Sequence, residues 1–273
     1  MLWLLLLQVS ASCLWLGHSE VVNSFATCPQ FFYQNSPPNN ALQPANPAWI
    51  CQRYNNQYHF ATLYDRNRRI PVYSAYRYQP GSGTRSKSWF VEPQLIPQVT
   101  FKNMETEWTL INKYKIRSQQ ISQSQAISQD YKNLKDLDRG HLCPSGHRSG
   151  NNSKWATFTL TNIVPQNSAL NKGTWQNYEN QMMAQKTQGC ITTYVIVGAV
   201  PGNTFIAGGR VNTPSHIWSA ACCQTKTKMD AWAVIAENDK DQIQPLTLGQ
   251  LEATLTQLYG KGQVSLFHSG CPR

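Results

Sequence analysis

Seven cysteines are spread over residues 28–271 of the 273-residue chain, and an eighth, Cys13, lies in an apolar N-terminal stretch. None of the seven has a partner at the CxxC spacing of a zinc ribbon, which argues against a zinc-nucleated fold. In an oxidising compartment six of them can form three disulfides, with one thiol left over. Adjacent Cys222 and Cys223 are expected to bond two different partners. The sequence leaves the connectivity open.

The N-terminal stretch has the pattern of a secretory signal peptide. A run of leucines at residues 4–7 is followed by small residues such as Ala11, Ser12 and Gly17. We therefore predict a signal peptide over residues 1–20 with cleavage near 17–22, a single domain over residues 21–273, and a secreted product. The apolar run is too short to span a bilayer, and no membrane span is expected elsewhere. The alternative is that this stretch is a strand or helix of the domain itself.

The charge of the chain is strongly unbalanced. Lys and Arg outnumber Asp and Glu by 24 to 14, a formal net charge of +10. A basic surface favours polyanionic partners, namely nucleic acid, anionic glycans or a membrane face. The same charge also fits a basic secreted protein that is kept soluble by repulsion. With 11% aromatic and 14% charged residues, the chain is neither a disordered tail nor a coiled coil.

Strand and helix patterns are mixed along the chain. Strands are predicted at 60–64 and 70–78, around a turn at 65–69, and at 158–163, 194–200 and 231–236. Residues 34–47 are expected to form a loop, and the Ser/Gln-rich residues 118–129 a loop or a polar helix. A helix is predicted over 168–186. Another is predicted after Thr247, which can form a capping box with Gln250. Leucines recur in this second helix at 248, 251, 255 and 258, and Gly260 suits its C-terminal end. The mixture predicts one α+β domain.

Residues 138–144, DRGHLCP, carry the first group of chemically suggestive side chains. The imidazole of His141 titrates near neutral pH and can remove a proton from water. Arg139 can pair with a phosphate through two hydrogen bonds, and Gly140 permits a close approach of the backbone. On these residues alone, an ordinary loop with an ion pair explains the segment as well.

A second group follows at TNIVPQ, residues 161–166, and at Asn171, Trp175 and Glu179. On a helix that starts near residue 168, the last three lie at i, i+4 and i+8 and form one stripe. The amide oxygen of Asn171 is a hard ligand that suits Mg²⁺, which keeps most of its waters. Alternatively, Asn171 and Glu179 are solvated helix residues and Trp175 belongs to the core.

The chain resembles the DNA/RNA non-specific endonuclease family over about residues 60–260. The resemblance rests on three motifs that occur in the family's order and at its offsets: DRGH, TN-x-x-PQ and N-x-G-x-W-x-x-x-E. Further stretches, such as CPQFFYQ and WSAACC, are similar to a vertebrate branch of that family. The resemblance implies a ββα-metal finger embedded in a mixed, mainly antiparallel β-sheet domain with flanking helices. It also implies hydrolysis of phosphodiester bonds in DNA and/or RNA with little sequence specificity.

The resemblance assigns a role to each matching residue. It implies His141 as the general base, Asn171 as the protein ligand to Mg²⁺ or Mn²⁺, and Glu179 as the residue that orients metal-bound water. Arg139 would contact the phosphate, and Asn162 would support the active-site loop. The family's basic residue upstream of the histidine corresponds to Arg85 or Lys87 in the segment TRSKSW, and the register leaves both open as substrate-binding residues.

Two rival functions remain at this stage. His141, Cys143 and His147 are nitrogen and sulfur ligands within seven residues and suggest a zinc site. A catalytically weak or inactive secreted protein could instead retain the nuclease fold and only bind polyanions. The sequence does not decide between DNA and RNA, and it leaves the oligomeric state open.

Two residues near the histidine motif carry expectations of their own. Cys143 departs from the family pattern, and we expect it to be the unpaired thiol, because a bridge would displace a loop that Pro144 already restricts. Nearby Arg139 and Arg148 could lower the pKa of this thiol and make it reactive if it is exposed. Asn151 begins the only N-x-S/T sequon and is expected to carry a glycan.

Overall fold

The structure, a computed structural model, describes residues 20–273. The predicted signal peptide, apart from its last residue, and Cys13 lie outside the described residues, so the cleavage position stays a prediction. Glu20, at the predicted boundary, is fully buried. Its backbone carbonyl accepts a hydrogen bond from the N–H of Cys51 at 2.8 Å. Residue 20 therefore packs as part of the domain.

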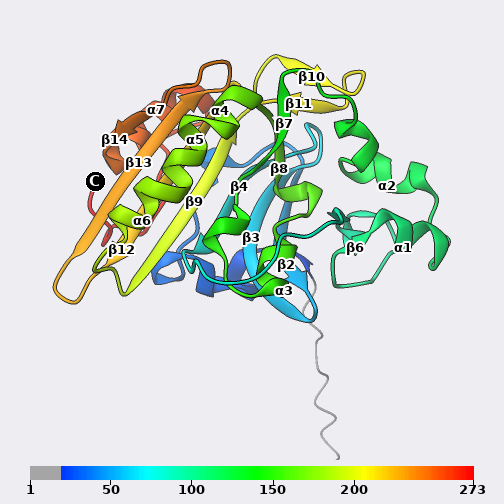
Figure 1. Cartoon of the computed structure of the whole chain (residues 1–273), viewed down its shortest axis with the longest axis horizontal. Coiled ribbons are helices and arrows are strands. Elements are labelled where there is room, and N and C mark those ends of the chain that lie inside the picture. Colours follow the sequence, from blue (N-terminus) through cyan, green and yellow to red (C-terminus); the bar gives the residue numbers. More distant parts are fainter. Residues whose placement is uncertain (1–19) are drawn as a thin grey trace, which may run out of the picture.

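An eight-stranded antiparallel sheet is the centre of the fold (Figure 1). Its strands, in spatial order, are β1 (Val21–Val22), β2 (Pro47–Tyr54), β3 (Gln57–Asp65), β4 (Ile70–Arg77), β9 (Thr192–Val200), β12 (His216–Gln224), β13 (Met229–Glu237) and β14 (Gln244–Leu246). The central strands are nearly continuous buried runs, because both faces of the sheet are covered. The predicted hairpin about residues 65–69 is confirmed as the β3–β4 connection.

Three short two-stranded ribbons lie outside the main sheet. They pair β5 (Phe90–Val91) with β6 (Glu105–Thr106), β7 (Leu137–His141) with β8 (Ile163–Asn167), and β10 (Thr204–Ile206) with β11 (Val211–Thr213). All three pairs are antiparallel. The β7–β8 ribbon holds the DRGH motif, so the motif lies on regular, hydrogen-bonded backbone.

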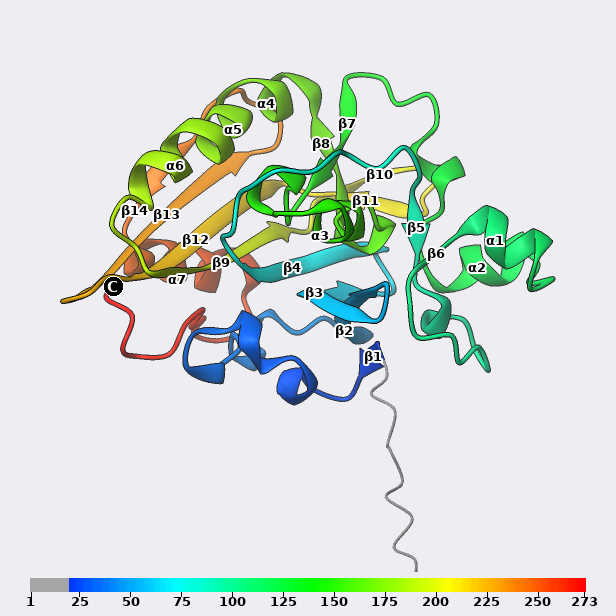
Figure 2. The same ribbon diagram turned by 60° about the horizontal axis from the view of Figure 1, so that its bottom comes forward.

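Helices cover both faces of the sheet (Figure 2). One face carries α3 (Asn151–Ala156), α4 (Ser168–Lys172), α5 (Thr174–Asn177) and α6 (Met183–Lys186), and the other carries α7 (Leu248–Tyr259) and the N-terminal 3-10 turns. At one side of the molecule, α1 (Glu107–Asn112) and α2 (Ser118–Ser124) form a lobe. The buried apolar residues accordingly form two large clusters, one on each face. None of the helices within residues 20–273 is long and apolar enough to cross a membrane.

The C-terminal helix forms as its sequence predicts. Thr247 caps the N-terminus of α7 in a capping box with Gln250. Gly260 ends the helix in the left-handed conformation, with φ of 61°. Leu248, Leu251 and Leu255 are all buried against the sheet.

The helix predicted over 168–186 is interrupted. Gly173 has φ −100° and ψ −116° and separates α4 from α5, and a π-helical turn (Tyr178–Met182) separates α5 from α6. A side chain at position 173 would collide with the carboxylate of Asp241, which accepts hydrogen bonds from the N–H and the hydroxyl of Thr174. This tertiary contact sets the start of α5.

The strand predicted at 158–163 is wrong. Residues Leu160–Asn162 form a 3-10 turn, and β8 begins only at Ile163. The reason is a side chain: the amide of Asn162 donates to the carbonyls of Cys143 and Thr157, which holds the turn closed. The Ser/Gln-rich segment is a short polar helix, α2, and residues 34–47 contain only 3-10 turns before β2.

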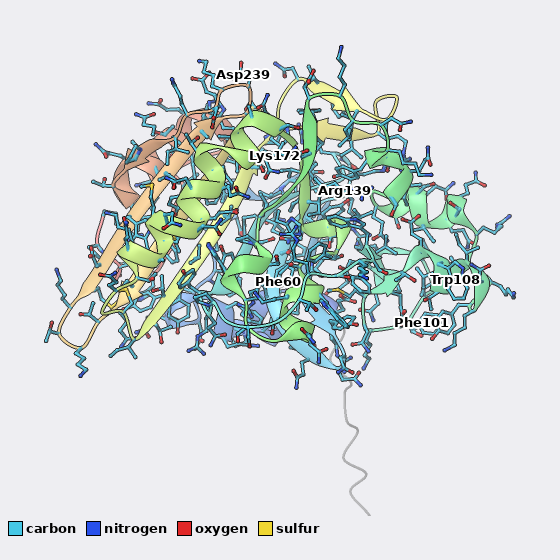
Figure 3. The ribbon with its side chains drawn as sticks, in the orientation of Figure 1. Phe60, Phe101, Trp108, Arg139, Lys172 and Asp239 are labelled. Atoms are coloured by element: carbon cyan, nitrogen blue, oxygen red, sulfur yellow. A yellow bond between two sulfur atoms is a disulfide. The ribbon has the colours of Figure 1, made fainter. Side chains whose placement is uncertain are left out.

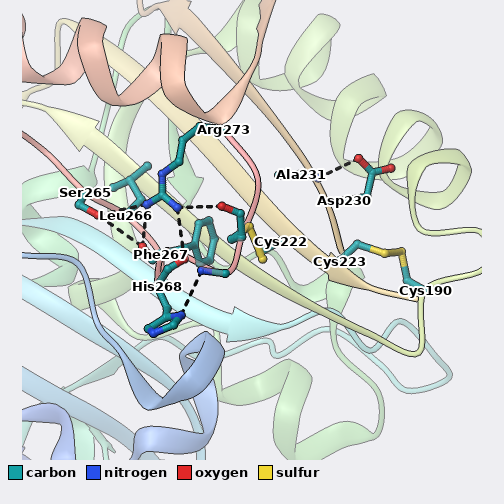
Figure 4. Close-up of a disulfide and its surroundings, with 12 residues drawn as sticks. Cys190, Cys222, Cys223, Asp230, Ala231, Ser265, Leu266, Phe267, His268 and Arg273 are labelled. Atoms are coloured by element: carbon teal, nitrogen blue, oxygen red, sulfur yellow. Dashed lines mark hydrogen bonds between the residues drawn. A yellow bond between two sulfur atoms is a disulfide. The ribbon is translucent and has the colours of Figure 1, made fainter. Parts of the chain in front are cut away.

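Three disulfides join six of the described cysteines. The pairs are Cys28–Cys51, Cys190–Cys223 and Cys222–Cys271. Adjacent Cys222 and Cys223 thus bond different partners on opposite faces of β12, as predicted (Figure 4). Cys143 is the one free thiol among residues 20–273, which confirms that expectation.

Candidate active site

The β7–β8 ribbon followed by α4–α6 places the predicted site residues in one ββα unit. His141 is the last residue of β7 and pairs with Ile163 at the start of β8. Gly140 beside it must be glycine, because a β-carbon there would collide with the side chain of Gln166. The close approach of the two strands therefore fixes where the imidazole is presented.

A pocket of about 520 Å³ opens between this unit and the loop before β5. Five of the predicted site residues line it, namely Arg85, Arg139, His141, Asn171 and Glu179. Lys154 and Lys172 line it too, so cationic side chains outnumber the single carboxylate, Glu179. A pocket of this charge attracts anionic ligands.

The imidazole of His141 is held in an aromatic and cationic environment. Its ring lies 4.9 Å from the ring of Phe158 and 5.7 Å from that of Trp89, measured between centroids. Burial, and then the charge of Arg85, lower the pKa of His141 to about 3. The imidazole is therefore neutral at physiological pH, with a lone pair available. Among the described residues, its Nε2 has no hydrogen-bond partner.

The side-chain amide of Asn171 is oriented by its neighbours. Its Nδ2 donates to Oδ2 of Asp138 at 3.1 Å, and Nζ of Lys172 lies 3.0 Å from the same oxygen. Burial raises the pKa of Asp138, but hydrogen bonds from Asn171 and Lys172 outweigh it, so this carboxyl titrates below its usual range. Because the amide nitrogen is engaged, the oxygen of Asn171 is the atom left to face the pocket. Figure 3 labels Lys172 on α4 and Arg139 on β7; the two elements are neighbours, and both residues line the pocket.

The carboxyl of Glu179 lies one helical turn beyond a buried tryptophan. Nε1 of Trp175 donates to Oε1 of Glu179 at 3.0 Å, so Trp175 is both a core residue and a hydrogen-bond donor in the site. Burial raises the pKa of Glu179 to about 8, against the opposing effects of Trp175 and Arg85. A cation bound in the pocket would favour the ionised form.

The structure separates the two basic candidates upstream. Arg85 lines the pocket, lies 5.1 Å above the ring of Phe158 and donates to Oγ of Ser145 at 3.4 Å. Both residues are exposed, but Lys87 does not line the pocket. Arg139 stacks 4.8 Å over Trp89 and donates to the carbonyl of Ser128. Of the two upstream candidates, Arg85 is thus the one whose position fits a phosphate contact.

Asn162 lies beneath the pocket and does not line it. Its Oδ1 accepts hydrogen bonds from the N–H of Cys143 and the hydroxyl of Ser74, both at 2.9 Å. Its backbone carbonyl accepts from the N–H of Leu142 at 3.0 Å. The residue therefore fixes the backbone that follows His141, in keeping with a supporting role.

Cys143 does not have the environment expected for a reactive thiol. It is fully buried, and burial raises its pKa to about 12 despite the charge of Arg148. The guanidinium of Arg148 is itself buried and donates to the carbonyls of Arg77 and His59. The expectation of a lowered pKa is wrong, because burial outweighs the nearby charge.

The zinc alternative does not fit the geometry. Nδ1 of His147 lies 2.9 Å from the hydroxyl of Tyr76, and Nε2 lies 2.9 Å from the carbonyl of Glu179. Both ring nitrogens are therefore occupied within the protein. Within residues 20–273, no three His, Cys, Asp or Glu side chains group as metal ligands.

Asn151, the predicted glycosylation site, is the exposed first residue of α3. Its Oδ1 accepts hydrogen bonds from the N–H and hydroxyl of Thr84. Thr84 precedes Arg85, so the start of α3 and the pocket-lining loop are joined at this point.

Sequence reasoning missed two contributors to the site. Asp138 begins the DRGH motif but received no role of its own from the sequence. In the structure it orients the side-chain amide of Asn171. Lys154 lines the pocket and donates to the carbonyl of Ser145, and nothing in its local sequence marked it. Its position depends on the packing of α3 against the pocket loop.

The donor set suits a hard divalent cation. The free amide oxygen of Asn171 and the carboxyl of Glu179 are both oxygen donors that line one pocket. Mg²⁺ prefers such ligands and retains several waters, so it needs few protein atoms. The residues present therefore fit a hard divalent cation.

The chain resembles known proteins over most of its length. The family model described as DNA/RNA non-specific endonuclease matches residues 37–259. The human and mouse proteins named "Endonuclease domain-containing 1 protein" are 32% and 30% identical over 85% and 90% of this chain. The chain spans about half the length of these relatives, covering 46% and 48% of them.

The fold also has a counterpart among solved structures. A chain of the crystallised EndoG/EndoGI complex superimposes with a TM-score of 0.50 at 16% identity, covering 75% of this chain and 82% of that one. This likeness agrees with the mixed α+β architecture described above. The chain belongs to the DNA/RNA non-specific endonuclease family.

Proposed function

We propose that this protein is a metal-dependent endonuclease that hydrolyses phosphodiester bonds in DNA and/or RNA with little sequence specificity. The observation that carries the proposal is the pocket, in which a neutral imidazole, an oriented amide oxygen, a carboxyl and several cationic side chains meet. Family membership supports the same reaction class. Contacts to the phosphate backbone carry no sequence information directly, which agrees with low specificity.

In the proposed mechanism His141 removes the proton from the attacking water. Its pKa of about 3 describes the pocket without substrate, where burial and Arg85 oppose protonation. A bound phosphodiester anion compensates the charge of Arg85 and raises the proton affinity of the imidazole. His141 thus becomes a stronger base when substrate is in place.

The cationic side chains position the phosphate. Arg85 and Arg139 contact its non-bridging oxygens, where negative charge grows as the water attacks. The aromatic contacts of both guanidinium groups fix them in place before substrate arrives. Hydrolysis that breaks the bond to the 3′ oxygen leaves a 5′-phosphate end.

Asn171 would hold the divalent cation, Mg²⁺ or Mn²⁺, and Glu179 would orient water bound to it. When bound, such an ion supplies positive charge that stabilises the phosphorane-like transition state and the leaving oxygen. Asp138 acts through Asn171 by holding its amide nitrogen.

We further propose that the protein is secreted and that Asn151 is glycosylated. Three disulfides support an oxidising compartment. A glycan on Asn151 would stand beside the loop that carries Arg85. The change of intact mass on glycosidase treatment, for protein from a eukaryotic host, tests occupancy.

The alternative is a catalytically weak or inactive polyanion-binding protein with the same fold. A plasmid-nicking assay distinguishes the nuclease from the inactive binder. Supercoiled plasmid is incubated with the protein in Mg²⁺, and in a parallel sample with EDTA in excess over Mg²⁺. The proposal expects nicked and linear DNA with Mg²⁺ and none with EDTA. Binding of the plasmid without nicking under both conditions would favour the alternative.

A further inference from the structure

A cavity of about 400 Å³ lies apart from the pocket that holds His141. It is enclosed by the β3–β4 turn, which contributes Arg66, Asn67 and Arg69, by the segment that follows β5, and by α2, which contributes Gln123. None of the described residues that line this cavity also lines the pocket of His141. The volume of the cavity falls within the range of small-molecule sites, roughly 300–1,000 Å³.

The two arginines at this cavity lack a carboxylate partner. Asp65, the carboxylate of the same turn, forms its salt bridge with Arg68 at 3.0 Å and accepts backbone N–H groups of the turn through its other oxygen. In the part of the chain that the structure describes, Arg66 and Arg69 form no salt bridge, and Nε of each is buried without a hydrogen-bond partner. Burial lowers the pKa of Arg66, with Tyr64 acting in the opposite direction, yet a guanidinium stays charged in proteins.

The remaining polar groups at the cavity also favour an anion. Among residues 20–273, no acidic side chain lines it. Nη1 of Arg69 donates to the carbonyl of Arg210 at 3.1 Å, which holds this guanidinium in place. Oδ1 of Asn67 accepts from Nδ2 of Asn46 at 3.0 Å, so the amide nitrogen of Asn67 is left as a further donor. The cavity thus offers two cations and a neutral donor without a carboxylate to balance them.

The charge and the number of donors select the kind of anion. A single guanidinium already matches both oxygens of one carboxylate, so two of them exceed what a carboxylate needs. A phosphate monoester carries a charge of about −1.5 to −2 at neutral pH and has three acceptor oxygens. We propose that this cavity binds one phosphate group, either free or at the end of a larger molecule, between Arg66 and Arg69. The site is independent of the proposed nuclease function.

Isothermal titration calorimetry of the full chain with inorganic phosphate tests this site. An Arg85→Gln background weakens anion binding at the pocket of His141, and EDTA is present throughout. We expect Arg66→Gln and Arg69→Gln, each in this background, to lower the affinity for phosphate about 10-fold or more. Arg68→Gln removes a positive charge from the same turn but from outside the cavity, and should leave the affinity unchanged.

Two results would overturn the proposal. One is the absence of phosphate binding by the background protein, and the other is an affinity that neither Arg66→Gln nor Arg69→Gln lowers. Circular dichroism and Tm check that each variant is folded. Because Arg66 forms no salt bridge within the described chain, its replacement should leave the fold intact.

A dinucleotide identifies the source of the phosphate. Under the same conditions, a thymidine dinucleotide with a 5′-phosphate is compared with inorganic phosphate and with the same dinucleotide lacking that phosphate. Tighter binding of the phosphorylated dinucleotide than of inorganic phosphate would indicate a phosphate group on a larger molecule, and weaker or equal binding would indicate free phosphate. Equal affinities of the two dinucleotides would contradict recognition of a terminal phosphate.

Discussion

The two faces of the central sheet are stabilised in different ways. The α7 face is mainly apolar, and two of the three disulfides, Cys28–Cys51 and Cys222–Cys271, lie in its core. The pocket face also has an apolar core, but its site residues are positioned by hydrogen bonds between segments far apart in sequence, such as those of Asn162. The comparison indicates that one face supplies mainly stability and the other holds the proposed active site.

A large effect should follow from removing the proposed metal ligand on the pocket face. Asn171→Ala leaves the site without its direct ligand, and we expect the Mg²⁺ concentration for half-maximal cleavage to rise at least about 100-fold. Asp138→Asn, which disturbs only the orientation of Asn171, should raise it by about 10- to 100-fold. Metal titrations of plasmid nicking measure both. An unchanged titration for Asn171→Ala would place the ligand elsewhere.

On the α7 face we expect the reverse pattern. Leu255 is fully buried against the sheet, so Leu255→Ala should lower the free energy of unfolding by about 2–5 kcal/mol. At low temperature, the rate of DNA cleavage per folded molecule of Leu255→Ala should stay within about twofold of the wild-type rate. Denaturant unfolding and initial rates test this pair of outcomes. A large loss of rate in a folded Leu255→Ala protein would show that the two faces are not separable.

Acid should destabilise the pocket face through its buried histidines. Burial lowers the pKa of His147 to about 4, below its usual value near 6.5. The unfolded chain then binds the proton first, so this stability is complete above pH 6.5 and is lost as the pH falls toward 4. His147→Gln should make the dependence of unfolding free energy on pH shallower, by up to about 1.4 kcal/mol per pH unit in this window. An equal slope in both proteins would contradict the burial of a neutral imidazole.

The smallest effect concerns the buried thiol. Cys143 is enclosed beneath the pocket, and its raised pKa disfavours the reactive thiolate. We expect negligible alkylation of the native, unreduced protein and one label per chain after unfolding without reductant. Peptide mapping should place the label on the segment with His141. Rapid labelling of the native protein would show that this loop opens.

The same contrast explains what the sequence could predict. The α7 helix follows from local signals, a leucine repeat between a capping box and Gly260. The break at Gly173 does not, because it depends on Asp241 far along the chain. Likewise, a strand is predicted at 158–163, but long-range side-chain hydrogen bonds close a 3-10 turn there.

Within the site, the motifs identified the residues but not their surroundings. DRGH and the Asn171–Glu179 spacing marked His141, Asn171 and Glu179, and these line one pocket. The choice of Arg85 over Lys87 required the path of the loop that contacts Asn151. The burial of Cys143 likewise depends on packing that no local pattern records.

The central claim is that the pocket face carries phosphodiester hydrolysis with His141 as the base. Its most direct test compares cleavage rates of wild type and His141→Ala at saturating Mg²⁺, alongside their Tm values and affinities for DNA. We predict a rate about 10²- to 10⁴-fold lower for His141→Ala, with Tm and DNA affinity close to wild type. A His141→Ala protein that cleaves DNA at the wild-type rate would contradict the account.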